Sequence, residues 1–299
     1  MIIYQILTVI VLLCPLAFAY DDNHPPTMED LNRDIAINPD SADAYFDRGI
    51  LWEKQGNLAR AIADLSQAAK LNPQDAVAYY SLGNAYAKAN DLTQAIADYG
   101  KVIELTPQDA TVFYDRALAY DALGNTAQAI SDFTQAIKLN PDYTEAYHNR
   151  ALTWDKIGDT APAMADLNKA IELNPSLTEA YYNRGVINDK KGNLIDAIND
   201  FSQAIKIDPE YAQSYANRGE VYIEQDDLPQ ARFDLTKAIE LDPKIAQSYN
   251  NRAIVYYQLK QYSKALYDLQ QARQLGYPVD PGFIASIKKA GPDKKEIDR

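Results

Sequence analysis

Cysteine and histidine are almost absent from this 299-residue chain. Its single cysteine, Cys14, lies in an apolar N-terminal run, so the rest of the chain can form neither a disulfide nor a cysteine metal site. The two histidines, His24 and His148, lie far apart in the sequence, which argues against a histidine metal site. We therefore predict a protein that uses no metal and no other cofactor.

Basic residues are also in the minority. Lys and Arg total 29 against 42 Asp and Glu, which gives a net charge of −13 at pH 7. Nucleic-acid binding relies on basic patches, so we predict no nucleic-acid partner. The composition, 47% hydrophobic and 24% charged, is that of a folded protein and excludes a wholly disordered chain.

Charge is missing altogether from residues 1–19. This run ends in Ala17-Phe18-Ala19, the small-x-small pattern of a signal-peptidase site, and favours a cleaved signal peptide. An uncleaved membrane anchor is the alternative, since a span needs roughly 18 apolar residues. A lipoprotein is disfavoured because Leu13, which is not small, precedes Cys14. Either way we expect an exported protein, periplasmic or secreted, that touches a membrane only through residues 1–19, if at all.

Proline recurs with a period of 34 residues, and a fixed period of this length predicts stacked supersecondary units. The prolines stand at 39, 73, 107, 141, 175, 209 and 243. With Ala42 as position 1, the chain contains seven repeats: 42–75, 76–109, 110–143, 144–177, 178–211, 212–245 and 246–279. We predict a linker and an N-terminal capping half-repeat over 20–41, and a C-terminal capping helix and tail over 280–299.

The pattern inside each repeat predicts two amphipathic helices. Position 4 is aromatic in every repeat, position 8 is small, and position 11 is aromatic except at Asn188. Position 20 is always Ala, position 24 is large and apolar, and position 27 is Ala except at Val102. Both triplets have helical spacing. Small residues let the two helices approach, and the larger ones fill the space between them.

This framework resembles that of the tetratricopeptide repeat (TPR) family, and the resemblance extends over residues 42–279. It implies an all-α fold, a right-handed superhelical α-solenoid of antiparallel helix pairs. It also implies that the first helix of each repeat lines a concave groove.

Position 7 is Arg in every repeat except the second, which has Leu82, and position 23 is always Asp. Position 7 leans towards the buried stripe, where an unpaired guanidinium would be costly. We therefore predict a structural ladder of bidentate Arg–Asp pairs, either within a repeat or between neighbours. Its members are Arg48, Arg116, Arg150, Arg184, Arg218, Arg252, Asp64, Asp98, Asp132, Asp166, Asp200, Asp234 and Asp268.

Positions 5 and 6 share the face that lines the groove in TPR proteins. The resemblance implies that Asn at position 6 hydrogen-bonds the backbone of a bound peptide; the alternative is a solvated surface residue. The rings at position 5 are either anchors for a ligand or packing groups. The candidate peptide-binding residues are Phe46, Tyr80, Tyr114, His148, Tyr182, Asn149, Asn183, Asn217 and Asn251.

The groove positions are acidic, and no repeat has Lys or Arg at positions 2, 5 or 6. TPR proteins that clamp a partner's C-terminal carboxylate need basic residues there. We therefore expect the partner to be a protein or peptide segment that is neutral to basic.

No catalytic motif accompanies the repeats: we find no cysteine nucleophile beyond Cys14, no glycine-rich phosphate loop and no HExxH motif. We predict that the protein is not an enzyme but an exported adaptor that binds an extended segment. The family suggests roles in envelope assembly, secretion or host interaction. The alternative is a structural scaffold that associates through its convex face or its ends, and the oligomeric state stays open.

Overall fold

The computed structural model describes residues 26–291, so the predicted signal segment 1–19 and the last eight residues lie outside the described range. Every regular element within that range is a helix. The first five are α1 (Met28–Ile37), α2 (Ala42–Lys54), α3 (Leu58–Leu71), α4 (Ala76–Lys88) and α5 (Leu92–Leu105). The others are α6 (Ala110–Ala122), α7 (Thr126–Leu139), α8 (Thr144–Lys156), α9 (Thr160–Leu173), α10 (Thr178–Lys190), α11 (Leu194–Ile207), α12 (Ala212–Glu224), α13 (Leu228–Leu241), α14 (Ala246–Gln258), α15 (Tyr262–Gln274) and α16 (Pro281–Ala290).

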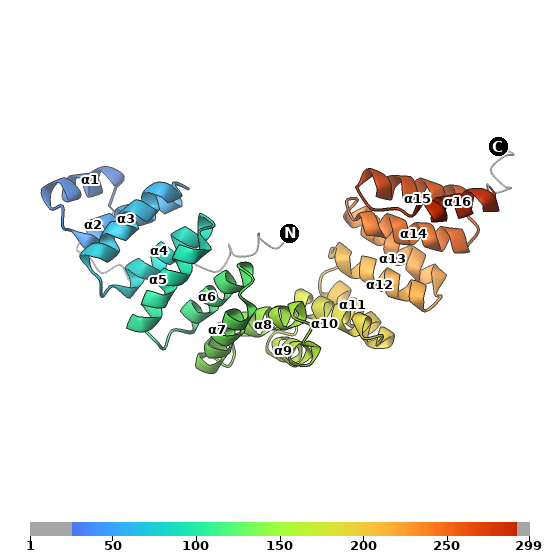
Figure 1. The fold of residues 1–299 in the computed structure, drawn as a ribbon, viewed down its shortest axis with the longest axis horizontal. Helices are drawn as coiled ribbons and strands as arrows, with labels where there is room; N and C mark the ends of the chain where they lie inside the picture. Colours follow the sequence, from blue (N-terminus) through green and yellow to red (C-terminus); the bar gives the residue numbers. More distant parts are fainter. Residues whose placement is uncertain (1–25, 292–299) are drawn as a thin grey trace. The chain divides into compact units, whose positions relative to one another are not determined.

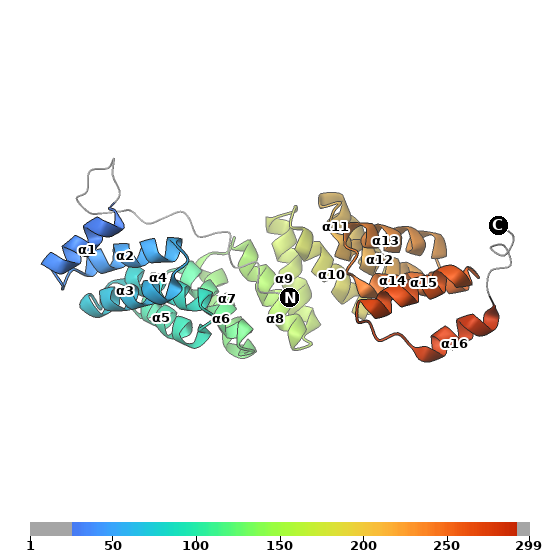
Figure 2. The same cartoon turned by 90° about the horizontal axis from the view of Figure 1, so that it is seen from above.

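The helices form two compact units, one ending at Pro107 and the other beginning at Gln108. Helices α1–α5 belong to the first unit and α6–α16 to the second. In both units each repeat is a pair of packed helices, and each second helix contacts the first helix of the next repeat within its unit (Figure 1, Figure 2). Consecutive first helices within a unit are also in contact. The predicted all-α solenoid of helix pairs is confirmed.

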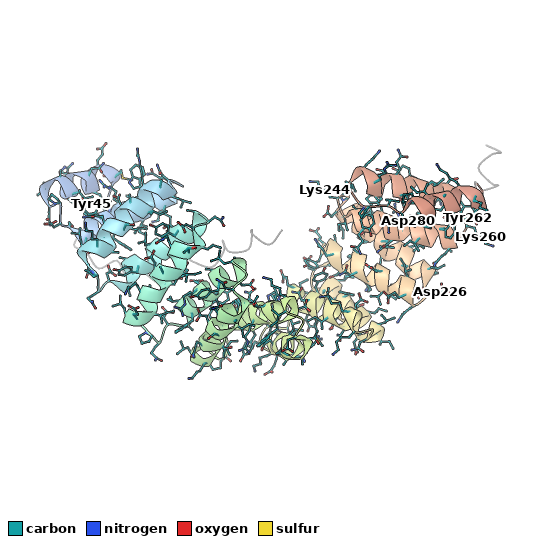
Figure 3. The ribbon with its side chains drawn as sticks, viewed as in Figure 1. Tyr45, Asp226, Lys244, Lys260, Tyr262 and Asp280 are labelled. Carbon is teal, nitrogen blue, oxygen red and sulfur yellow. The ribbon has the colours of Figure 1, made fainter. Side chains whose placement is uncertain are left out.

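The turn inside each repeat depends on one residue with a left-handed backbone. Position 15 has a positive φ in every repeat, and where it is glycine the φ lies between 74° at Gly192 and 80° at Gly158. Three repeats use other residues there, listed with their φ: Asn90 (63°), Asp226 (60°) and Lys260 (59°). Figure 3 shows Asp226 and Lys260 at one edge of the C-terminal repeats and Lys244, from a turn between repeats, at the opposite edge.

The core lies between the two helices of each repeat and follows the predicted positions. The alanine at position 20 is fully buried in all seven repeats, from Ala61 to Ala265. Opposite it the large residue at position 24 is also buried, as with Phe133 and Phe201, both 0% exposed. Close approach requires small residues: a Cβ added to Gly185 at position 8 would lie 2.7 Å from the Phe201 ring.

The residue before each first helix changes character along the chain. In the first three repeats it is Ser41, Asp75 or Asp109, whose side chain accepts a hydrogen bond from the helix N-terminus. The last four repeats have Tyr143, Leu177, Tyr211 and Ile245, which make no such bond. Their side chains are larger and apolar or aromatic, and three of them contact the candidate site.

Helix α16 covers the open end of the last repeat. Ile287 is fully buried with Ala253, Ala265 and Leu269, and Phe283 and Ile284 pack against the same cluster. At the other end Leu31 of α1 is 1% exposed. The two ends of the array thus carry shortened elements that bury one face, as solenoids require.

Candidate functional site

All six predicted arginines form an ion pair with the aspartate sixteen residues later in the same repeat. Arg218 is typical: its Nε donates to Asp234 Oδ2 over 2.7 Å and its Nη2 donates to Oδ1 over 2.9 Å. The aspartates are 0–10% exposed and the arginines 13–23% exposed. The pairs are Arg48–Asp64, Arg116–Asp132, Arg150–Asp166, Arg184–Asp200, Arg218–Asp234 and Arg252–Asp268.

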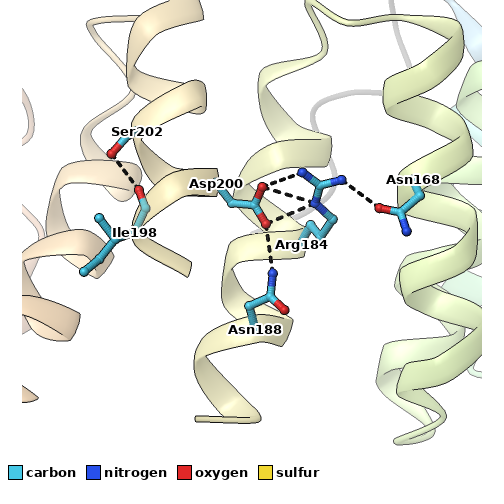
Figure 4. Close-up of polar contacts among 6 residues, drawn as sticks. All are labelled: Asn168, Arg184, Asn188, Ile198, Asp200 and Ser202. Atoms are coloured by element: carbon cyan, nitrogen blue, oxygen red, sulfur yellow. Dashed lines mark hydrogen bonds and ion pairs between the residues drawn. The ribbon is translucent and has the colours of Figure 1, made fainter. Parts of the chain in front are cut away.

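The remaining guanidinium nitrogen reaches back to the preceding repeat. Arg184 Nη1 donates to Asn168 Oδ1 on α9 over 2.7 Å, while Asp200 on α11 takes the other two nitrogens (Figure 4). Arg48, Arg150, Arg218 and Arg252 make the same contact through Nη1, to Asn32, Thr134, Ser202 and Thr236 respectively. Each of these arginines therefore joins two repeats. The polar residue at position 25 is the signal in the sequence for this contact, which was not among the predictions.

The aromatic ring at position 4 lies beside the guanidinium in all six repeats that contain it, and the ring at position 11 does so in three of them. Arg252 lies 5.8 Å from the Tyr249 ring centroid and 5.6 Å from that of Tyr256. The one repeat without an aromatic at position 11 has Asn188, which is buried and donates to Asp200 Oδ2 over 3.0 Å (Figure 4). In this repeat position 11 therefore contributes a hydrogen bond to the ion pair.

Asp98 belonged to the predicted ladder but is not part of an ion pair, because position 7 of its repeat is Leu82. Its Oδ2 is buried and accepts no hydrogen bond. Burial raises the pKa of Asp98 to about 6. The fold therefore disfavours the ionised form of Asp98 at neutral pH.

The predicted peptide-binding residues of the second unit contact one another across repeats. Asn149 Nδ2 donates to Tyr114 Oη over 2.8 Å, and Asn217 Nδ2 donates to Tyr182 Oη over 3.1 Å. Between them Asn183 Nδ2 lies 2.9 Å from His148 Nε2. Position 6 of one repeat thus holds position 5 of the repeat before, a contact that the sequence analysis did not predict.

These rings are also packed from the other side. Tyr114 lies 4.9 Å from Tyr143 between ring centroids, and Tyr182 lies 5.3 Å from Tyr211. Burial raises the pKa of both Tyr114 and Tyr182 and lowers the pKa of His148. The rings are therefore half-buried and held in fixed orientations. In the first unit Phe46 packs against the core cluster of Leu65 and Leu82, and Tyr80 lies 6.0 Å from Tyr99 between ring centroids.

A pocket of about 170 Å³ lies on the first-helix side of the second unit, lined by α10, α12, α14 and the turn before α14. Its lining brings together three of the predicted residues, Tyr182, Asn217 and Asn251. Asn251 differs from the other amides because it is buried, 7% exposed, and its side chain hydrogen-bonds Glu220. The other lining residues are Gln213, Ala216, Glu220, Ile245, Gln247 and Ser248.

A second set of ion pairs joins neighbouring first helices. Lys88 Nζ on α4 donates to Glu53 Oε1 on α2 over 2.5 Å, and Lys190 Nζ on α10 donates to Asp155 Oδ2 on α8 over 2.8 Å. Lys156 pairs with Asp121 in the same way. In each pair an acid at position 12 accepts from the lysine at position 13 of the following repeat. The repeat pattern alone did not predict these pairs.

Family models described as tetratricopeptide repeat or TPR repeat match the chain between residues 17 and 267. The matched ranges are 17–80, 65–97, 83–124, 110–143, 144–177, 178–211, 212–245 and 235–267. Together with the helix pairs these matches decide the family. The chain belongs to the tetratricopeptide repeat family. No curated protein matches it significantly by sequence.

Solved TPR structures share the fold. A tetratricopeptide repeat protein from Parabacteroides merdae is 22% identical, with a TM-score of 0.63, over 84% of this chain and 98% of its own. YrrB, described as a TPR protein with an unusual peptide-binding site, is 25% identical, with a TM-score of 0.55, over 63% of this chain and 97% of its own. Pseudomonas aeruginosa PilF is 17% identical, with a TM-score of 0.60, over 72% of this chain and 98% of its own.

Membership of the TPR family indicates a protein–protein interaction adaptor, since TPR proteins are generally non-catalytic and bind peptides or proteins. Within residues 26–291 no helix is long and apolar enough to span a bilayer. The same residues contain no cluster of three or more His, Cys, Asp or Glu side chains placed to hold a metal ion.

Proposed function

We propose that this TPR protein is an exported, non-enzymatic adaptor that binds an extended protein or peptide segment along its first helices. The observation that carries the proposal is the pocket on the first-helix side of the second unit. It is lined by Tyr182, Asn217 and Asn251, three residues selected from the sequence for peptide binding. Amides and fixed rings on adjoining helices offer hydrogen bonds and stacking surfaces to an extended backbone.

The amide row supports the same mode of binding. In Asn149, Asn183 and Asn217 one N–H of the amide orients the ring of the preceding repeat. The carbonyl and the second N–H of each amide are groups that a bound backbone can use. Such a row is independent of side-chain sequence, so selectivity would come from neighbouring charges.

A peptide array tests this binding directly. The triple variant Tyr114→Ala/Asn183→Ala/Asn217→Ala should bind array peptides at least about tenfold more weakly than the wild type, because it removes three side chains that would contact the peptide. The control triple variant Gln128→Ala/Ser131→Ala/Gln203→Ala changes exposed residues of the second helices and should bind as the wild type does. Equal binding by all three proteins would remove the first-helix surface from the proposal.

Export is the second part of the proposal, and it rests on residues 1–19 and on the small-x-small pattern that ends at Ala19. Sequencing the N-terminus of the protein isolated from its source should read from Tyr20 after signal cleavage. An intact Met1 on a membrane-bound protein would instead indicate an anchor. Affinity capture from the exported compartment would then assign the partner to envelope assembly, secretion or host interaction.

Association through the second helices is the alternative function, and two exposed rings favour it. Phe233 on α13 is 63% exposed and Tyr267 on α15 is 60% exposed, both at position 22 of neighbouring repeats. Light scattering on the wild type and on Phe233→Ser/Tyr267→Ser tests it. A dimer or larger assembly that the double variant abolishes would support the scaffold, and a strict monomer would exclude it.

A further inference from the structure

Of the four junctions between repeats three and seven, the first two have an ion pair between first helices and the last two do not. Asp121 and Asp155 each accept from the lysine at position 13 of the next repeat. Between repeats five and six the corresponding residues are Asp189 and Glu224, so two carboxylates stand where the other pairs have a carboxylate and an ammonium. Lys190, the lysine next in sequence to Asp189, is already paired with Asp155.

A third carboxylate, Glu220, adds to the negative charge at this point. Its pKa is raised by burial and then by Asp189, and the pKa of Asp189 is raised by burial and then by Glu224. No lysine or arginine is among the groups that shift either one. Only the neutral side chains of Asn251 and Gln247 donate to Glu220, Gln247 Nε2 over 2.8 Å, and Asp189 Oδ1 is buried without a hydrogen-bond partner.

The pocket beside Glu220 also contains an unpaired hydroxyl. Ser248, one of its lining residues, is 1% exposed and its Oγ has no hydrogen-bond partner, as is true of Ser214 at the same position of the preceding repeat, which does not line the pocket. Buried hydroxyls are normally paired, because an unpaired one loses the hydrogen bonds that it makes to water. The pocket wall also includes Ala216, Ile245 and the Tyr182 ring, which are suited to the methylene stem of a long side chain.

We propose that Asp189, Glu220 and Glu224, together with this pocket, form a subsite for a lysine or arginine side chain of the bound segment. The stem would lie against Ile245 and Tyr182, and the cationic head would reach the carboxylates, replacing the lysine that this junction lacks. Ser248 Oγ would gain a donor or acceptor from the same segment. This inference rests on the proposed binding along the first helices. It adds that the segment carries a positively charged side chain at this subsite.

The test uses the full-length chain and two matched peptide arrays. One array carries 12-residue peptides of randomised sequence, and the other carries the same peptides with every Lys and Arg replaced by Gln. We expect the wild type to prefer the first array by about tenfold, since a desolvated charge pair contributes on the order of 1.4 kcal/mol or more. Glu220→Gln/Glu224→Gln should lose that preference, so that its binding to the two arrays becomes equal.

Two further variants control for charge and for folding. Glu210→Gln/Glu240→Gln removes the same charge from exposed positions away from the pocket and should keep the preference. Glu224→Lys supplies the ion pair seen between repeats three and four and between four and five, so it should raise the melting temperature and abolish the preference. If Glu220→Gln/Glu224→Gln fails to fold, Glu224→Lys alone decides the result.

The outcomes separate this inference from the proposed function. A wild type that binds neither array contradicts binding along the first helices and the subsite with it. A wild type that binds both arrays equally, or a preference that survives in Glu224→Lys, overturns the subsite but leaves the proposed function intact. Stabilisation of the wild type by Ca²⁺ alone, lost in Glu220→Gln/Glu224→Gln, would overturn it in favour of a metal site.

Discussion

Each arginine at position 7 combines several interactions in one side chain. Arg218 binds Asp234 through two nitrogens, donates to Ser202 of the preceding repeat through a third, and lies between the Tyr215 and Tyr222 rings. An ion pair out of water stabilises a fold only when its hydrogen bonds are satisfied. Here each of the three guanidinium nitrogens donates a hydrogen bond, which offsets the cost of burying the charge.

Removal of one partner from such a pair should therefore be costly. Asp200→Ala leaves Arg184 and Asn188 without their acceptor, and we expect a loss of about 3–5 kcal/mol in unfolding free energy. Glu210→Ala, at an exposed turn, is the control and should change stability by less than about 0.5 kcal/mol. Urea denaturation measures both. An unchanged midpoint for Asp200→Ala would contradict a structural role for the pair.

Asp98 should make the stability of its repeat depend on pH. Its pKa rises from 3.8 to about 6 in the fold, so the native state favours the protonated carboxyl. Well below pH 3.8 the carboxyl of Asp98 is protonated in both the folded and the unfolded state, so there is no penalty for burying a charge. Stability should then fall as pH rises towards 6, and the full penalty should persist above that.

The variant Asp98→Asn isolates this effect. At pH 7 it should be more stable than the wild type by on the order of 1–2 kcal/mol, a value reduced from the full shift because the side chain is partly exposed. At pH 4 the difference should be much smaller. Asp132→Asn, which breaks an existing pair with Arg116, should instead destabilise at pH 7. A pH-independent difference for Asp98→Asn would rule out the buried-carboxylate explanation.

At the scale of the helix, the turn inside each repeat depends on backbone conformation more than on side-chain contacts. Gly56, Gly124, Gly158 and Gly192 have no neighbour near an added Cβ. Glycine is therefore used there for its positive φ and not for space. Asn90, Asp226 and Lys260 adopt the same φ with a side chain, which costs about 1–2 kcal/mol for most residues.

Lys260→Gly should remove that strain. We expect an increase in unfolding free energy of about 1 kcal/mol, less than the full strain because glycine is more flexible in the unfolded chain. Lys244→Gly is the matched control at the opposite edge, where φ is not positive, and it should lower stability slightly. Thermal melting compares the two. An equal loss for both variants would show that Lys260 is not strained.

At the scale of the whole molecule, stability in an array of repeats is a sum over neighbours, so the ends matter. Helix α16 closes the second unit by burying Ile287 against Ala253, Ala265 and Leu269. Without this contact the last repeat would expose its apolar face to water.

Ile287→Ala tests this cap. We expect a loss of about 2–5 kcal/mol, with hydrogen exchange accelerated first in α14 and α15 and least in α6. Ile195→Ala, at a residue 72% exposed, should have almost no effect. Uniform acceleration from α6 to α15 would show that the unit unfolds as a single cooperative block, in place of repeat by repeat.

The 34-residue period, with its small and aromatic positions, was enough to predict helix pairs, their buried faces and the TPR resemblance. These features depend on helical spacing and turn chemistry, which are local. The partners of individual polar groups could not be predicted in this way. Asn149 meets Tyr114, and Lys190 meets Asp155, at a separation of 35 residues, one more than the period. Which side chains meet across repeats depends on the rotation and offset between neighbouring helices, and only tertiary packing sets those. The same packing determined that Asn251 is buried and that Asp189 faces Glu224.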